Sequence, residues 1–244
     1  MDYSKLKEEW INLSKNWIKE SRYGRNPTRN GLLDKPMLGA CGNISGLNIL
    51  DCECGEGRFC RLLANRNAGY LLGIDLCEPL IKAAKELQGV NEEYKVADAQ
   101  NLSFLKDETI DIAISYLNQC DLPEYEKNNK EIFRVLKTNG YFIVANLHPM
   151  RSASDGWCKN ESEKKEHVIL DNYFDESERR WRMLENEFTN FHRTLSTYIN
   201  NFIDTGFSII KIIEPTIKKE QLAEYPELED ELRVPNFIIY KLRK

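Results

Sequence analysis

The stretch from Asn48 to Phe59, N-I-L-D-C-E-C-G-E-G-R-F, limits the possible folds more than any other part of the chain. A short apolar run ends in Asp51, Gly55 and Gly57 follow, and residues 58–64 have the apolar spacing of a helix. A strand, a glycine turn and a helix start in this order place a nucleotide-like ligand on a helix N-terminus. We therefore predict a βα unit whose turn binds such a ligand.

A second acidic residue follows the next apolar run. The run 70–74 ends in Asp75, which lies 18 residues after Gly57. A carboxylate at the end of that strand can accept hydrogen bonds from both hydroxyls of a ribose. The turn and the acid together indicate a cofactor that contains adenosine.

The turn does not suit a dinucleotide. Cys60 stands at the third position of G-x-G-x-x-G, where close packing of helix on strand requires glycine. The carboxylates of Asp51, Glu53 and Glu56 would repel a pyrophosphate. S-adenosylmethionine has no phosphate and carries an ammonium and a sulfonium, so these residues favour it over a nicotinamide dinucleotide.

This turn resembles the first motif of the class I S-adenosylmethionine-dependent methyltransferases, which reads roughly L-D-x-G-C-G-x-G. Glu53 stands where that family usually has its first glycine, and this is a departure from the pattern. The resemblance covers residues 47–148 closely and extends more loosely to residue 244. The residues that match the motif are Leu50, Asp51, Cys54, Gly55 and Gly57.

The resemblance implies that S-adenosylmethionine is the cofactor, and it assigns residues to its binding. Asp98 would face the adenine amino group, and the amide of Ala99 would reach a ring nitrogen. The end of the fourth strand, at Ser115 and Tyr116, would also lie beside the cofactor. The implied cofactor-binding residues are Tyr23, Arg29, Asp51, Glu53, Cys54, Gly55, Asp75, Leu76, Asp98, Ala99, Ser115 and Tyr116.

Apolar segments with the spacing of strands alternate along the chain with segments that have the spacing of helices. This alternation predicts an α/β fold with a Rossmann-like sheet, mostly parallel and covered by helices on both faces. The resemblance implies seven strands, with an antiparallel last strand between the fifth and the sixth. Strands are expected at 47–51, 70–75, 93–97, 111–116, 140–147, 207–213 and 237–242. Helices are expected at 4–20, 58–66, 78–88, 124–136 and 194–205, with a short one near 218–224.

We divide this single domain into four segments. Residues 1–46 are expected to form a helix and a polar connector that closes over the cofactor as a lid. Residues 47–149 form the cofactor-binding core, and residues 193–244 complete its sheet. Residues 150–192 are an insert that covers the substrate, with an antiparallel β portion at about 167–192.

The candidate catalytic residues lie outside the glycine turn. An amine or hydroxyl acceptor must lose a proton during methyl transfer, and a general base can take it. His148 follows the fifth strand, where open α/β sheets bind ligands. The resemblance to a group of bacterial small-molecule methyltransferases implies that His148 and His192 both face the pocket, where one would orient or deprotonate the acceptor. Tyr173 is expected to hold it, and for each histidine a purely structural role is the alternative.

The acceptor class follows from a motif that this chain lacks. After the fourth expected strand, this chain reads Ser115-Tyr-Leu-Asn-Gln, whereas many amino-group methyltransferases have the motif Asn/Asp-Pro-Pro-Tyr at this place. This argues against nucleic-acid bases and favours a nitrogen or oxygen of a small molecule, for example in secondary-metabolite biosynthesis, with carbon methylation not excluded. Two alternatives are a non-catalytic S-adenosylmethionine-binding protein, which Glu53 suggests, and a nicotinamide-dependent oxidoreductase.

Composition limits the partners and the location. The net charge of -5 does not suit a nucleic-acid binder. The apolar runs are too short to span a membrane and no signal-peptide core is present, so we expect a cytoplasmic protein. The odd number of cysteines, seven, predicts reduced thiols, and Cys52 and Cys54 are too close for a standard zinc pair, so no metal is expected. A monomer and a homodimer are both compatible with the sequence.

Overall fold

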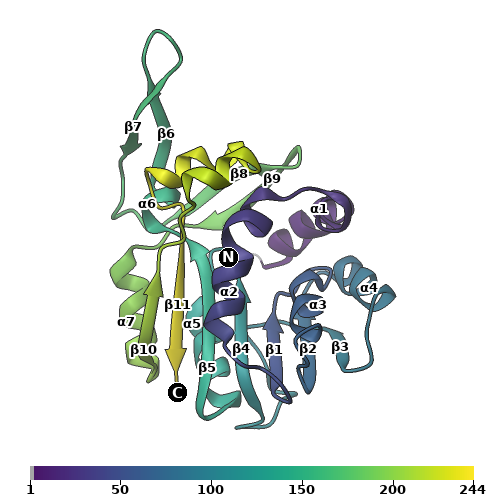
Figure 1. The fold of residues 1–244 in the computed structure, drawn as a ribbon. Coiled ribbons are helices and arrows are strands. Elements are labelled where there is room, and N and C mark those ends of the chain that lie inside the picture. Colours follow the sequence, from purple (N-terminus) through teal and green to yellow (C-terminus); the bar gives the residue numbers. More distant parts are fainter. Residues whose placement is uncertain (1–2) are drawn as a thin grey trace.

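The computed structural model describes residues 3–244, and at its centre is a seven-stranded sheet of order β10-β11-β5-β4-β1-β2-β3 (Figure 1). β1 to β5 pair in parallel, and β11 runs antiparallel to both of its neighbours. The predicted sheet, with its antiparallel last strand between the fifth and sixth core strands, is therefore confirmed. The strands are β1 (Asn48–Cys52), β2 (Tyr70–Asp75), β3 (Glu92–Val96), β4 (Ile110–Tyr116), β5 (Leu136–Leu147), β10 (Ser208–Ile213) and β11 (Phe237–Arg243).

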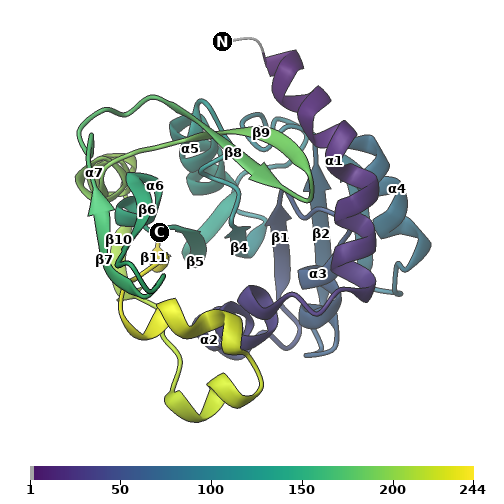
Figure 2. The same cartoon turned by 90° about the horizontal axis from the view of Figure 1, so that it is seen from above.

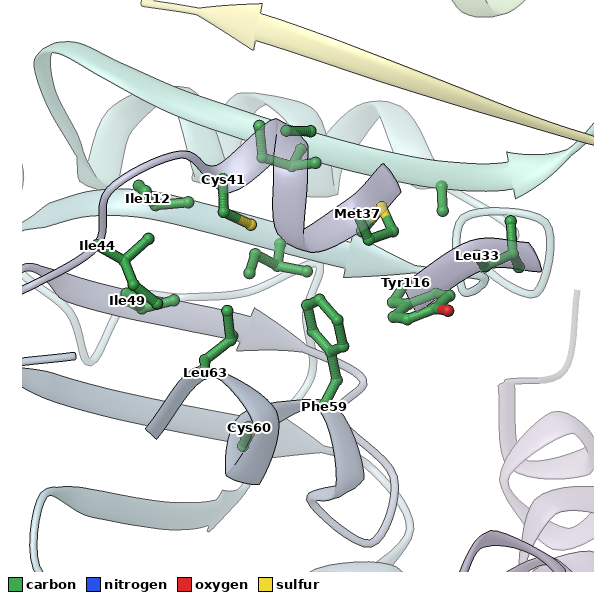
Figure 3. Close-up of a cluster of buried hydrophobic side chains, with 14 of the residues drawn as sticks. Leu33, Met37, Cys41, Ile44, Ile49, Phe59, Cys60, Leu63, Ile112 and Tyr116 are labelled. Atoms are coloured by element: carbon green, nitrogen blue, oxygen red, sulfur yellow. The ribbon is translucent and has the colours of Figure 1, made fainter. Parts of the chain in front are cut away.

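Two hydrophobic clusters cover the two faces of the sheet, because successive strand side chains point to opposite faces. Ile49 of β1 belongs to one cluster, and its neighbour Leu50 belongs to the other. The first cluster packs α2 (Asp34–Cys41), α3 (Arg58–Ala64) and α4 (Glu78–Glu86) on the sheet, and Figure 3 shows part of it. The second cluster packs α5 (Tyr125–Val135) and α7 (Leu195–Thr205) on the opposite face.

The N-terminal segment is more helical than its sequence predicts. α1 (Tyr3–Tyr23) is followed by a π-helical turn, η1 (Thr28–Leu33), and then directly by α2. The sequence predicts a polar connector after the first helix, because its glycines and proline are typical of loops. Leu32, Leu33 and Met37 are buried in the first cluster, so packing on the sheet stabilises these turns.

The insert contains two antiparallel hairpins rather than one β portion. β6 (Ser154–Lys159) pairs with β7 (Lys165–Leu170), and β8 (Glu178–Met183) pairs with β9 (Asn186–Phe191). A short helix, α6 (Pro149–Ser152), leads into them, and two 3-10 helices, η2 (Lys219–Ala223) and η3 (Pro226–Leu232), precede β11. Seen from above, α1, the β8–β9 hairpin and these C-terminal turns surround the carboxyl ends of the parallel strands (Figure 2).

Close packing under the glycine turn gives the first testable prediction. A Cβ atom at Gly73 in β2 would lie 2.7 Å from Cδ1 of Tyr94 and 2.8 Å from Sγ of Cys54. We expect Gly73→Ala to lower the free energy of unfolding by about 1–3 kcal/mol, because overpacking a core forces its neighbours to shift. Urea denaturation measures the change.

Gly39→Ala is the matched control. No atom lies within 4 Å of a Cβ atom at Gly39, which lies in α2. Alanine is favoured over glycine inside helices by about 1 kcal/mol, so this variant should be unchanged or stabilised. Equal destabilisation by the two substitutions would contradict the packing explanation.

Candidate active site

A cavity that is open to solvent lies at the carboxyl ends of β1, β2 and β4. The turn between β1 and α3 forms its floor, and α1 and η1 contribute Trp10, Trp17 and Arg29 to its walls. Eight of the expected cofactor-binding residues line it. They are Arg29, Asp51, Glu53, Cys54, Gly55, Asp75, Leu76 and Tyr116.

The turn is built from residues with positive φ. Gly55 has φ 60° and Gly57, the N-cap of α3, has φ 79°. A Cβ atom at Gly57 would lie 2.6 Å from the hydroxyl of Tyr94, so only glycine fits there. The amide of Cys54 donates to the carbonyl of Ile74 at 2.8 Å, which joins the turn to the neighbouring strand.

Two buried carboxylates stand at this edge of the sheet. Asp75 accepts hydrogen bonds from the amides of Gly55 and Cys77, both at 2.8 Å, and burial raises its pKa to about 6. Asp51 is 1 % exposed, and burial raises its pKa to about 7. Its Oδ2 accepts a hydrogen bond from the Cys60 thiol at 3.2 Å, whereas Oδ1 is enclosed and has no partner among the described residues.

Glu53 adds a third carboxyl group to the cavity. It has φ 53°, and its Oε2 lies 3.4 Å from the amide nitrogen of Leu76. Burial, followed by the charge of Asp75, raises the pKa of Glu53. Its Oε1 is enclosed and, within residues 3–244, has no hydrogen-bond partner.

Arg29 supplies a cation to the same cavity. Its guanidinium carbon lies 4.9 Å from the ring centroid of Trp17 and 5.0 Å from that of Tyr116. Burial lowers the pKa of Arg29, and no carboxylate in the described part of the chain lies within 4.0 Å of it. An anionic ligand group would complete this environment.

These groups are complementary to a particular kind of ligand. The enclosed Oδ1 of Asp51 has no donor and calls for a hydrogen-bond donor or a cation, because an unsatisfied buried acceptor is costly. Arg29, between two aromatic rings, is placed to bind an anionic group. The cavity therefore fits a zwitterionic ligand that also carries hydroxyl groups.

Four expected cofactor-binding residues do not line the cavity. Tyr23 is 82 % exposed at the end of α1. Ala99 and Ser115 are fully buried beneath the surface, and Asp98 accepts a hydrogen bond from the amide of Gln100 at 2.8 Å.

His148 lies outside the cavity, where it caps the short helix α6. Its Nδ1 accepts a hydrogen bond from the amide of Met150 at 3.1 Å, and its Nε2 lies 3.2 Å from Oε1 of Glu214. Burial lowers the pKa of His148, which favours the neutral imidazole. Both ring nitrogens are therefore already engaged within the protein.

Tyr173 and His192 lie together in the insert, also outside the cavity. His192 is fully buried, with Nδ1 2.7 Å from the Ser152 hydroxyl and Nε2 2.8 Å from the Tyr173 carbonyl oxygen. The Tyr173 hydroxyl accepts a hydrogen bond from the Leu195 amide at 2.9 Å. These contacts join α6, the insert and α7.

The structure adds Asp121 to the cavity, a residue to which no sequence motif points. It is half-buried beyond the end of β4, and it accepts a hydrogen bond from Nδ2 of Asn190 at 2.8 Å. Burial raises its pKa to about 7. An acid shortly after a strand end could have been noticed, because ligands bind at that edge of open α/β sheets.

Metal sites and membrane-spanning helices are absent from the described residues. Between Tyr3 and Lys244, no group of three or more His, Cys, Asp or Glu side chains is placed to hold a metal ion. No helix within the same range has the length and apolar character needed to cross a membrane. All seven cysteines are free, as expected.

Comparisons with known proteins agree with this geometry. Residues 50–144 match the family model described as "Methyltransferase domain". An S-adenosylmethionine-dependent methyltransferase structure from Mesorhizobium loti superimposes with a TM-score of 0.78 and 27% identity, over 86% of this chain and 96% of that one. The structure of a protein from Listeria monocytogenes gives a similar match, with a TM-score of 0.77 and 29% identity over 86% of this chain and 95% of that one. The demethylmenaquinone methyltransferase of Lactococcus lactis is 33% identical over 115 residues, which are 44% of this chain and 45% of the relative.

The raised pKa of Asp51 gives a prediction about stability and pH. Its folded-state pKa of about 7 lies above the ordinary value of 3.8, so the native state binds more protons between these values. Stability therefore falls as pH rises through this range. When the pH rises from 5 to 7.5, the free energy of unfolding should fall by roughly 2 kcal/mol more in the wild type than in Asp51→Asn. Urea denaturation at the two pH values measures this difference.

Asp155→Asn serves as the control for this measurement, because Asp155 is an exposed carboxylate in the insert. Its pH dependence should match the wild type. The interpretation of Asp51 would be wrong if Asp51→Asn and the wild type lost the same free energy over this pH interval.

Proposed function

Because the chain belongs to the class I S-adenosylmethionine-dependent methyltransferases, we propose that it methylates a nitrogen or oxygen of a small-molecule acceptor, with secondary-metabolite biosynthesis as its setting. The observation that carries this proposal is the cavity that Arg29, Asp51, Asp75 and Asp121 share. Its walls come from α1 and from the loop after β4, so an acceptor would reach the cofactor between these segments. The named relative from Lactococcus lactis also acts, by its name, on a small molecule.

The residues of the cavity suit the parts of S-adenosylmethionine. We assign the ribose hydroxyls to Asp75, the ammonium to Asp51 and the carboxylate to Arg29. Asp98 and the Ala99 amide are assigned to the adenine ring, as the resemblance implies. When bound, the cofactor supplies an electrophilic methyl group on its sulfonium, and the protein supplies position and exclusion of water.

The acceptor proton needs a group that can take it near neutral pH. Asp121 lines the cavity, and its pKa of about 7 suits a general base. His148 and His192 remain candidates from the sequence, and each would have to exchange a contact within the protein for one with the acceptor. We therefore place Asp121 before the histidines as the proton acceptor, with Tyr173 as a residue that holds the insert.

An acceptor screen with methyl-labelled S-adenosylmethionine tests the proposed function. Small amines, phenols and carboxylic acids are offered separately from transfer RNA and from unrelated proteins. Label should appear on a small molecule at nitrogen or oxygen. Label only on RNA or protein would contradict the proposal.

Asp75→Ala is expected to weaken S-adenosylhomocysteine binding by about 30- to 100-fold, because charge-assisted hydrogen bonds contribute a few kcal/mol. Calorimetric titration measures the affinity. Asp75→Asn keeps an acceptor for the Gly55 amide and controls for collapse of the turn. Unchanged affinity in both variants would remove Asp75 from the site.

Asp121→Asn is expected to lower kcat at least tenfold and to change the S-adenosylhomocysteine affinity less than twofold. The loss should follow from removal of the proton acceptor, so the decline of kcat at low pH should disappear as well. His148→Ala and His192→Ala should also spare cofactor binding and lower turnover. If none of the three variants changes turnover with the true acceptor, no general base is used and positioning alone suffices.

A further inference from the structure

Glu53 has the backbone conformation that glycine takes most easily. Its φ of 53° lies in the left-handed region, which is unfavourable for a residue with a Cβ atom. The same conformation directs its side chain into the cavity, where it is one of the lining residues. Because the side chain fills space inside the binding site, its contacts bear directly on the ligand.

The carboxyl group of Glu53 engages backbone donors at the ends of two neighbouring strands. Its Oε2 lies 3.4 Å from the amide nitrogen of Leu76, which directly follows β2. The amide of Ala99, which lies just beyond β3, also acts on this carboxyl and favours its ionised form. An adenine ring bound at this edge needs backbone donors for its ring nitrogens. Because Ala99 is fully buried, the ring can reach its amide only if the Glu53 side chain moves away.

The surroundings hold the Glu53 carboxyl only weakly. The negative charges of Asp75 and Asp98 both disfavour the ionised form of the Glu53 carboxyl. Its Oε1 is enclosed without a partner among residues 3–244, which is unfavourable for either protonation state. A ligand that supplies its own acceptors to the two amides can therefore displace this side chain.

We propose that Glu53 sets the cofactor affinity of this enzyme, because its carboxyl competes with the adenine ring for the amides of Leu76 and Ala99. Cofactor binding then requires the side chain to leave these amides. The inference depends on the cofactor assignment and is independent of the acceptor. The chain with glycine at this position is the tighter binder.

Calorimetric titration of Glu53→Gly with S-adenosylhomocysteine, and separately with adenosine, tests the proposal. Both ligands should bind about tenfold more tightly than to the wild type, because both contain the competing ring. The gain should be similar for the two ligands, since the competition does not involve the amino-acid end. Unchanged or weaker binding of S-adenosylhomocysteine by this variant would overturn the proposal.

Glu163→Gly is the matched control for backbone strain. Glu163 has φ 60°, and its side chain is 80% exposed in the turn between β6 and β7. Relief of strain there should leave the ligand affinity unchanged. A similar gain of affinity in this control would overturn the proposal, because release of the amides would not be the cause.

A second measurement does not depend on how Glu53→Gly folds. In the ligand-free wild type and in Glu53→Gln, the amide resonances of Leu76 and Ala99 report on the side chain that they contact. Exchanging the carboxyl for an amide should shift both resonances, and S-adenosylhomocysteine should remove the difference between the two proteins. Resonances that are insensitive to the substitution would contradict the contact on which the inference depends.

Discussion

The hydrogen bond from the Gly55 amide to the Asp75 carboxylate is the contact on which the site depends. It joins the turn after β1 to the end of β2, and a second bond, from the Cys54 amide to the Ile74 carbonyl, supports it. Close approach of the two segments is possible because Gly73 has no side chain, since a Cβ atom there would lie 2.8 Å from Sγ of Cys54 in the turn. Asp51 and Asp75 are thus fixed at one sheet edge before any ligand binds.

The N-terminal segment closes this edge and is held there by buried charges. Glu56 is 1 % exposed and pairs with Arg61 of α3 at 2.7 Å and with Arg22 of α1 at 3.4 Å. Removing one member of a buried pair is strongly destabilising, since the other charge is left uncompensated. An ion pair between Arg58 and Asp34 holds α2 in the same way. Positioned by these pairs, Trp17 and Arg29 become part of the cavity wall.

Much of the sheet could be predicted because β1, β2 and β5 contain short apolar runs, and the place of the antiparallel last strand came from the family resemblance. Asp51 and Asp75 could be assigned to the site for the same reason, as each directly follows such a run. The helices at 28–41 were not predicted, because their burial depends on contacts that Leu33 and Met37 make with distant strands. Local propensity alone indicates a loop there.

The catalytic side of the site was harder to predict. His192 bonds to Ser152, which lies 40 residues earlier, so its role in joining the insert to α6 depends on tertiary structure. Asp121 follows a strand end, but it enters the cavity only through the path of the loop after β4, which depends on tertiary structure. Glu53 was visible as a departure from the family motif, whereas its contacts with the strand-end amides required the structure.

The most direct test of the cofactor assignment is a calorimetric titration of the purified protein with S-adenosylhomocysteine, with NADH as the contrast. Carboxyl groups at the turn and Arg29 between two aromatic rings predict micromolar binding of S-adenosylhomocysteine and no binding of NADH. Binding of NADH, or no binding of S-adenosylhomocysteine, would contradict the assignment of S-adenosylmethionine to this cavity.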